Sequence, residues 1–308
     1  MNKCLKKFLK FGVPLWLIAY LWPNRRQRLP VIFESLKKPY TIAHRGGAAL
    51  APEETLVAFA YSEKVGANMF EYDVHITKDG YLIASHDPTV DRITTGSGRI
   101  NDLTLAEIKQ FDAGEKFVDL KGTQPYKGKG VALATVEEIF QHFPYMPAVI
   151  ELKDTNEPIL YEAMIQEMWR LIQKYNMQDK VIIASFDHAI NQRFQEISTG
   201  QVAIGGGESE AKRYIIKLLL RLNGIIRTDA QAFQLPLEQH NIDLTQRNII
   251  KGSQHLGIDV YYWTINDEAT MRKLVRRDVD GIMSDNPALL SRVIKEELQR
   301  REQKLKNR

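Results

Sequence analysis

Cysteine is nearly absent from this chain of 308 residues. The single thiol, Cys4, excludes both a disulfide and a thiolate metal site within one chain. Zinc-finger spacing, an aromatic RNA-binding motif and a basic helix with base-reading residues are also missing, so nucleic acid is not an expected partner. No glycine-rich dinucleotide fingerprint follows the first strand-like run, which argues against a nucleotide-binding open sheet.

A long hydrophobic run is missing as well. The most apolar stretch, residues 11–23, would span only about 20 Å as a helix, short of the roughly 30 Å hydrocarbon core of a bilayer. Basic residues flank it on both sides, and no small-residue cleavage site follows it. We expect residues 1–28 to form a membrane anchor or interfacial segment that makes the protein membrane-associated. A hydrophobic strap packed on the folded domain is the alternative.

The composition, 44% hydrophobic and 26% charged, is that of a chain with a sizeable core. From residue 40, short β-branched runs alternate with segments of helical period such as 55–65, 157–175, 267–276 and 287–299. Eight such runs predict a (β/α)8 TIM barrel, with a doubly wound open sheet as the alternative. The runs are 40–43, 69–75, 148–152, 180–185, 201–204, 231–235, 259–264 and 280–284.

One further run, 81–86, follows the second strand after only "TKDG". That connection is too short for a parallel crossover but suits a hairpin turn, so we expect an antiparallel return arm. Residues 88–134 hold no barrel strand and predict a small rim insertion with a short helix near 104–111. The barrel domain then spans 38–300 and is followed by a charged tail, 301–308.

Acidic side chains gather where the predicted strands end. Glu71 and Asp73 lie two residues apart and share one strand face, as do Glu151 and Lys153 on the next strand. Carboxylates that converge in a barrel mouth cannot all ionise without a cation. They predict one hard divalent ion, Mg²⁺ or Ca²⁺, whereas Glu71 and Asp73 alone could also pair with internal lysines.

Two histidines follow strand ends at the same predicted rim. His44 and Arg45 precede two glycines in "HRGG", and His86 ends the hairpin arm. A guanidinium binds phosphate charge and an imidazole moves protons near neutral pH, so the stretch suits a phosphate ester. For "HRGG" alone, a surface turn is the alternative.

Six motifs between residues 40 and 290 resemble, in order, the signature set of the glycerophosphodiester phosphodiesterase family, including its membrane-associated, lysophospholipase-D-like branch. They are "HRGGAALAPEETLVAF", "FEYDVHITKDG", "ASHD", "IELK", "YYWTIN" and "GIMSDNP". The resemblance implies a (β/α)8 barrel that hydrolyses a phosphodiester with a divalent metal. One position departs from the family pattern, because Glu54 places an acceptor-only carboxylate where the family has an asparagine amide.

The implied chemistry assigns roles to these side chains. His44 and His86 form the acid–base pair, with their order open and metal ligation as the alternative for His86. Arg45 and Lys153 hold phosphate oxygens beside the metal on Glu71, Asp73 and Glu151. Trp263 presents its indole to the organic part of the substrate or, alternatively, packs in the barrel core.

The expected substrate is a lysophospholipid, a diester that still carries one acyl chain, met at a membrane surface. Besides residues 1–28, the stretch 212–227 supports this, because Arg213, Lys217 and Arg221 recur every four residues and predict an interfacial helix. An ordinary outer helix of the barrel is the alternative. For the function, the alternatives are a soluble diester, giving glycerol 3-phosphate and an alcohol, and a non-catalytic lipid-binding barrel. The oligomeric state is left open.

Overall fold

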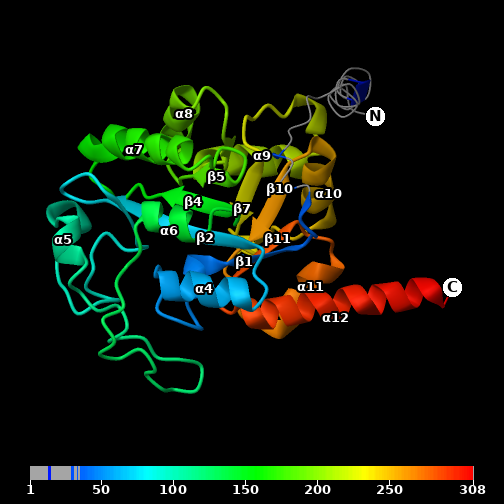
Figure 1. Ribbon diagram of the computed structural model, residues 1–308. Helices are drawn as coiled ribbons and strands as arrows, with labels where there is room; N and C mark the ends of the chain where they lie inside the picture. The colour runs from blue at the N-terminus through cyan, green and yellow to red at the C-terminus, as the bar shows by residue number, and fades with distance from the viewer. Residues whose placement is uncertain (1–12, 15–28, 31–32, 34, 308) are drawn as a thin grey trace.

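The fold is a barrel of parallel strands surrounded by helices (Figure 1). The computed structural model describes residues 13–14, 29–30, 33 and 35–307. In that part of the chain, eight parallel strands follow one another in the order β6-β5-β4-β2-β1-β11-β10-β7. Their bounds are β1 Tyr40–Ala43, β2 Met69–Ile76, β4 Ala148–Leu152, β5 Val181–Ala184, β6 Ala203–Ile204, β7 Ala232–Leu235, β10 Asp259–Tyr262 and β11 Gly281–Ser284. Each coincides with a predicted run.

The ring closes between β6 and β7, which is its weakest seam. Within the described residues a single bridge, Gly205 to Ala232, joins these strands, whereas β2 and β4 pair over five positions. A Cβ on Gly206 would lie 1.9 Å from the ring of Phe233, so the seam requires a glycine there. The fold is therefore the predicted TIM barrel, nearly closed, and not an open sheet.

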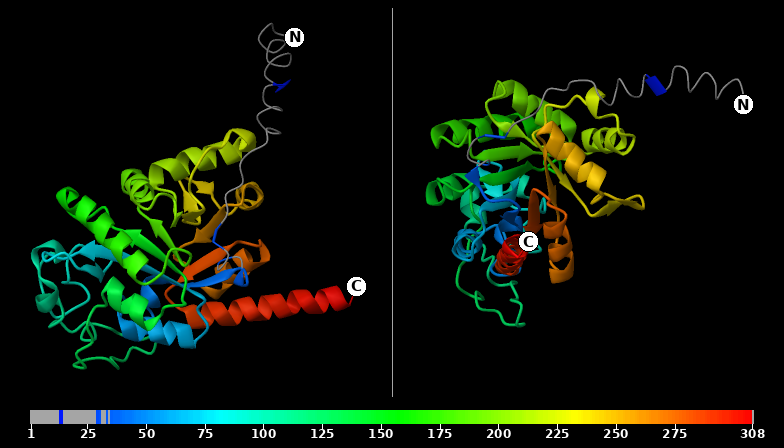
Figure 2. Two further views of the ribbon diagram at one scale, coloured as in Figure 1. Left: turned by 45° about the horizontal axis from the view of Figure 1, so that its top comes forward. Right: turned by 90° about the vertical axis from the view of Figure 1, so that its right-hand side faces the viewer.

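Helices cover the outside of the barrel, and the views in Figure 2 show α12 running from the strand ends past the body of the molecule. The helices are α4 Leu56–Lys64, α5 Leu105–Ile108, α6 Val136–His142, α7 Tyr161–Lys174, α8 His188–Ile197, α9 Glu208–Leu219, α10 Arg247–Leu256, α11 Glu268–Arg276 and α12 Pro287–Lys306. Side-chain caps begin several of them. A capping box of Thr135 and Glu138 begins α6, with each side chain accepting a hydrogen bond from the other's backbone.

Apolar side chains form one layer inside the barrel and one outside it, as the two-residue period of a strand requires. Tyr40, Ile42 and Met69 pack inside, where Leu29 and Phe33 close the base. Outward-facing residues of β2 pack under α4, α6 and α7, and those of β10 and β11 under α10, α11 and α12. Tyr262 of β10 is one of these outward-facing residues.

An ion cluster lies at the base of the barrel. Nζ of Lys38 is 2.6 Å from Oδ1 of Asp259 and 3.0 Å from Oδ1 of Asp280. Asp280 also accepts hydrogen bonds of 3.1 Å from the backbone of Val260 and the side chain of Gln254. Burial and the neighbouring Asp280 raise the pKa of Asp259 to about 6, against the opposing charge of Lys38. Because the chain supplies the counter-charge, this cluster serves the fold.

The hairpin predicted after β2 is confirmed. Strand β3, Leu82–Ala84, pairs antiparallel with the end of β2. Residues 88–134 follow, and an apolar cluster that includes Val90, Ile93 and Ile108 packs them against Ile83 of β3. This packing fastens the 88–134 segment to the barrel beside the mouth.

The helix predicted over 212–227 is wrong in its bounds. Helix α9 ends at Leu219, and Arg221 has a φ of 56°, in the left-handed region. Asn223 and Gly224, both poor helix formers, follow in a short 3-10 turn. Arg221 therefore leaves the helical stripe of Arg213 and Lys217.

Helix α12 continues beyond its predicted end at 299, and residues 301–306 of the charged tail belong to it. Ion pairs one turn apart, such as Arg292 with Glu296 at 3.2 Å, support a helix of this composition. Across the described residues, none of the helices is both long and apolar enough to cross a bilayer. The predicted anchor, residues 1–28, lies outside the described residues except for positions 13 and 14.

Candidate active site

The inward-facing side chains change from apolar at the base of the barrel to polar at its mouth. Because side chains alternate along a strand, every second residue points inward. On β1 the inward series is Tyr40, Ile42 and then His44, which follows the strand end. On β2 the inward series is Met69, Glu71 and Asp73. On β4 it is Val149, Glu151 and then Lys153, which follows the strand end. Since β2 and β4 pair Asp73 with Glu151, these two carboxylates lie at one level, and Glu71, which is paired with Val149, lies next to them on the side of the base.

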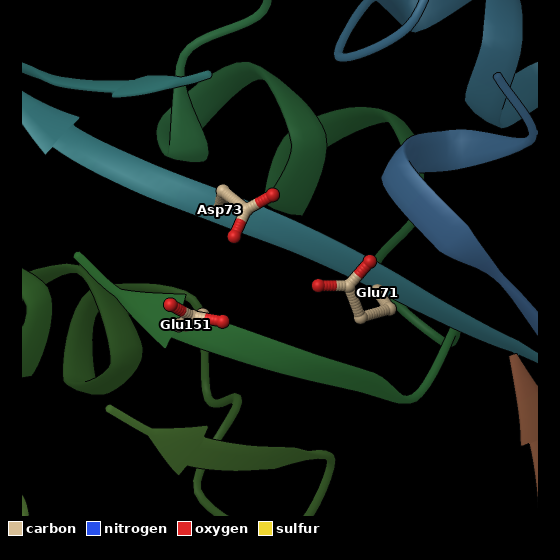
Figure 3. A group of neighbouring side chains, drawn as sticks. All are labelled: Glu71, Asp73 and Glu151. Carbon is tan, nitrogen blue, oxygen red and sulfur yellow. The ribbon is translucent and has the colours of Figure 1, made fainter. Parts of the chain in front are cut away.

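The carboxylates of Glu71, Asp73 and Glu151 approach one another at this level (Figure 3). One oxygen from each lies within 4.8 Å of the others. Burial, together with repulsion from Asp73, raises the pKa of Glu71 to about 7 and that of Glu151 to about 8. Oδ2 of Asp73 is buried and accepts no hydrogen bond. A set of hard oxygen donors with an unsatisfied member fits a divalent cation.

Two cationic side chains border the carboxylates. Nζ of Lys153 lies 2.7 Å from Glu151 and 3.3 Å from Asp73. Arg45 has a φ of 50°, so its backbone N–H donates to Glu71 at 2.9 Å while its side chain lies 3.6 Å from Asp73. The glycines after it, at φ of 75° and 97°, complete this tight turn. Both cations can therefore reach an anion bound beside the carboxylates.

His44 is held by an aspartate from the far end of the chain. Its Nδ1 lies 2.6 Å from Oδ1 of Asp285, and Oδ2 of Asp285 accepts a 2.6 Å hydrogen bond from the amide of Asn266. Nε2 of His44 is left near Thr264, at 3.5 Å, and Glu71, at 4.0 Å. Although burial opposes protonation, Glu71 and Asp285 raise the pKa of His44 above its usual value.

His86 is held in a similar way from the opposite side. Its Nδ1 lies 2.7 Å from Oδ1 of Asp87, and Oδ2 of Asp87 accepts a hydrogen bond from Nε of Arg92. Arg92 in turn makes two contacts with Glu53, at 2.6 and 3.2 Å. Burial opposes ionisation of Asp87, yet these hydrogen bonds from Arg92 and His86 lower its pKa. Both imidazoles thus have an aspartate on Nδ1.

A cavity of about 260 Å³ joins these groups, and the eight side chains predicted for the site all line it. They are His44, Arg45, Glu71, Asp73, His86, Glu151, Lys153 and Trp263. Leu235, Pro236 and Phe186 contribute apolar surface to its wall, beside the polar side chains of Gln234, Gln239 and Glu208. Phe186 is 43% exposed and packs edge-on against Trp263, with ring centroids 6.3 Å apart.

Sequence reasoning missed the residues that hold the two histidines. Asp285 and Asn266 stand inside "GIMSDNP" and "YYWTIN", so the motifs contained them without indicating their contact with His44. Arg92 carried no sequence signal, because its role depends on where the 88–134 segment folds. His75, two residues after Asp73 on β2, is not part of the site, because its two ring nitrogens contact Ser85 and Thr155 at 2.9 Å each.

Glu54, the residue that departs from the family pattern, lies directly behind the carboxylates. Its side chain is fully buried, and Oε1 accepts a 3.2 Å hydrogen bond from the backbone of Asp73. Burial and the charges of Asp73 and Glu71 raise the pKa of Glu54 well above its usual value. It does not line the cavity and so supports the strand from outside the site.

A TIM barrel whose mouth combines clustered carboxylates, two supported imidazoles and two cations has the parts of a phosphoric diester hydrolase. The chain belongs to the glycerophosphoryl diester phosphodiesterase family, because the family model matches residues 44–289. The resemblance seen in the six motifs is therefore confirmed, and the enzyme class with it.

The relatives include proteins named for two related activities. The "Glycerophosphodiester phosphodiesterase" of Caldanaerobacter subterraneus subsp. tengcongensis is 30% identical over 84% of this chain and 98% of its own length. The human "Lysophospholipase D GDPD1" is 27% identical over 81% of this chain and 84% of its own. Among solved structures, an Oleispira antarctica phosphodiesterase in complex with the product sn-glycerol-3-phosphate is 26% identical, with a TM-score of 0.67, and covers 83% of this chain and 97% of its own.

Proposed function

We propose that this chain hydrolyses glycerophosphodiesters with a divalent cation, Mg²⁺ or Ca²⁺, held by Glu71, Asp73 and Glu151. The observation that carries the proposal is the position of these carboxylates in one cavity with two aspartate-held imidazoles. The bound ion would supply charge neutralisation for the phosphodiester as the transition state forms.

The two histidines account for both proton transfers. One imidazole takes a proton from the nucleophile, a water or a hydroxyl of the substrate, as its oxygen bonds to phosphorus. The other gives a proton to the alcohol oxygen as the second phosphorus–oxygen bond breaks. An aspartate on Nδ1 of both His44 and His86 leaves Nε2 for this work. Arg45 and Lys153 hold the remaining phosphate oxygens.

The substrate we propose retains an acyl chain, as a lysophospholipid does. The apolar wall formed by Trp263, Phe186 and Leu235 supports this, because it gives the organic part of a substrate an apolar contact that a small polar diester does not need. The name of the human relative points in the same direction. The soluble alternative, release of glycerol 3-phosphate and an alcohol, has the support of the bacterial relative's name.

A membrane surface is the proposed location of the substrate, and the outer face of α9 supports it. Ile216 and Leu220 are 56% and 57% exposed there, and Ile225 follows at 45%. Residues 211–228 carry five cations and no acidic side chain. An exposed apolar ridge with cations beside it suits the headgroup region of an anionic bilayer. Ala211, in the first turn of the same helix, lines the cavity, so the N-terminal end of α9 lies beside the substrate path.

A substrate panel tests the proposal. Choline release is measured from lysophosphatidylcholine and from glycerophosphocholine, with the full chain and with a variant lacking residues 1–28. We expect the full chain to prefer the acylated diester and to bind anionic vesicles. If both proteins prefer glycerophosphocholine and neither binds vesicles, the substrate is a soluble diester and not a lysophospholipid.

A matched pair of variants tests the α9 face separately. Changing Ile216 and Leu220 to serine should weaken binding to anionic vesicles, whereas Ile159→Ser should not. Ile159, which precedes α7, is 86% exposed but lies away from the basic stretch. Equal vesicle binding by both variants would contradict a role for α9.

Metal removal separates the enzyme from a non-catalytic lipid-binding barrel. EDTA should abolish diester hydrolysis, and Mg²⁺ or Ca²⁺ should restore it. A pure binding protein would retain lipid binding and show no hydrolysis under either condition.

A further inference from the structure

Arg92 joins two acidic residues at the edge of the cavity. Its Nε contacts Oδ2 of Asp87, and its two terminal nitrogens contact the carboxylate of Glu53 at 2.6 and 3.2 Å. Arg92 belongs to the 88–134 segment, whereas Glu53 precedes α4. One guanidinium therefore ties this segment to the loop after β1, and bidentate contacts of this kind fix orientation as well as distance.

The contact with Asp87 reaches His86. Asp87 uses one oxygen for Arg92 and the other for Nδ1 of His86, at 2.7 Å. An aspartate shared in this way can only rotate if it gives up one of its two partners. A proton-transfer imidazole depends on such restraint, because it must present one defined nitrogen to the substrate.

The two imidazoles differ in how much else restrains them. The side chain of His44 is 14% exposed, and its Asp285 is held by Asn266 through both a side-chain and a backbone hydrogen bond. The side chain of His86 is 38% exposed. Apart from His86 itself and Arg92, the described residues place no side chain on the carboxylate of Asp87. The orientation of His86 thus depends on a single guanidinium.

We propose that Arg92 is a positioning residue that holds His86 in its reactive orientation through Asp87, with Glu53 anchoring the guanidinium. The inference rests on the proposed function, in which His86 transfers a proton. It assigns the 88–134 segment a part in the reaction, since that segment delivers Arg92. Arg92 itself does not line the cavity.

Steady-state kinetics of Arg92→Ala test the proposal. Loss of orientation should lower kcat by about 10- to 100-fold while KM changes by less than about threefold, because substrate contacts remain. Arg92→Lys, which keeps the charge, should recover part of kcat. Arg99→Ala is the matched control: Arg99 is an exposed arginine of the same segment and makes no ion pair with the described residues. It should leave kcat unchanged.

A double-mutant cycle shows whether the effect passes through Asp87. In an Asp87→Ala background, adding Arg92→Ala should lower kcat by less than about twofold, since the connection is already cut. An undiminished effect in that background would overturn the proposal. So would a rise in KM alone, which would make Arg92 a substrate contact.

Chemical rescue excludes a merely structural role. Millimolar guanidinium should raise kcat of Arg92→Ala, while tetramethylammonium, a cation without N–H donors, should not. Thermal melts check that the variants fold. The proposal is contradicted if guanidinium does not raise kcat of Arg92→Ala and if Arg92→Lys is no more active than Arg92→Ala. If wild type and all variants are inactive on every diester, the proposed function fails; a fully active Arg92→Ala beside an inactive His86→Ala defeats this inference alone.

Discussion

Buried carboxylates lie at both ends of this barrel, but only those at the mouth face a cavity. At the base, Lys38 pairs with Asp259 and Asp280, and Asp280 receives further hydrogen bonds. At the mouth, Glu71, Asp73 and Glu151 face a cavity, and one oxygen from each lies within 4.8 Å of the others.

The difference separates stability from chemistry within a single fold. The base has its counter-charge in the chain, so its ions hold elements together. The mouth brings three carboxylates together on the wall of a cavity, and that arrangement favours binding of an external cation. Substitutions at the mouth should therefore lower turnover, whereas substitutions at the base should lower the free energy of unfolding.

The largest expected effect is at the mouth. His44→Ala and His86→Ala should each lower kcat by about 10²–10⁴-fold, because each removes one proton-transfer group. Both variants should melt within a few degrees of wild type. Near-normal turnover in either variant would refute the role given to that histidine.

At the base, Lys38→Met should leave kcat unchanged and lower the free energy of unfolding by about 2 kcal/mol. The loss strands two buried carboxylates, and it stays moderate because Lys38 is itself 40% exposed. Urea denaturation measures it. Lys37→Met, an exposed neighbour, is the control and should have no effect; equal losses in both variants would mean that the pairing is not the cause.

A pair of isosteric changes should have effects of opposite sign on stability. In the metal-free protein near pH 8, Glu71→Gln should raise the free energy of unfolding by about 1 kcal/mol, since it removes one of several crowded charges. Asp280→Asn should lower it, because that carboxylate is fully paired. If Glu71→Gln destabilises instead, the mouth is already balanced without a metal.

The smallest expected effect is the pH dependence of stability, which should differ between the carboxyl groups at the mouth of the barrel and those at its base. The pKa values of Glu71 and Glu151 are raised to about 7 and about 8, so the metal-free folded state retains protons that the unfolded chain has released. By linkage, its stability should fall as the pH rises from about 5 towards 8. Asp259, with a pKa raised to about 6, acts mainly below that value.

Thermal melts with and without Mg²⁺ or Ca²⁺ measure this. The metal needs deprotonated ligands, so the stabilisation it provides should grow with pH over the same range. Glu151→Gln should flatten the metal-free profile between pH 6.5 and 8, while Asp259→Asn should not. A profile unchanged by Glu151→Gln would place the titrating groups elsewhere.

Much of the site was predictable because it follows from local rules. Because side chains alternate along a strand, Glu71 was expected on one face with Asp73, and Glu151 on one face with Lys153. Because the C-terminal ends of barrel strands form one rim, His44 and Arg45 were expected at that same rim. The short "TKDG" connection predicted the hairpin that brings His86 to the cavity. Helix ends were less predictable, because the apolar period of 212–227 continues past the point where Arg221 turns out of α9.

The amino-acid sequence by itself determined the strands, the order of the motifs and the family, since periodicity and spacing are properties of neighbouring residues. Only the tertiary structure decided which side chains hold His44 and His86 in place. Asp285 reaches His44 because β11 closes against β1, 241 positions apart in the chain. Arg92 reaches Glu53, 39 positions earlier in the chain, because the 88–134 segment packs beside the loop after β1. Such contacts depend on how distant segments pack together, which is a property of the whole chain that no local pattern records.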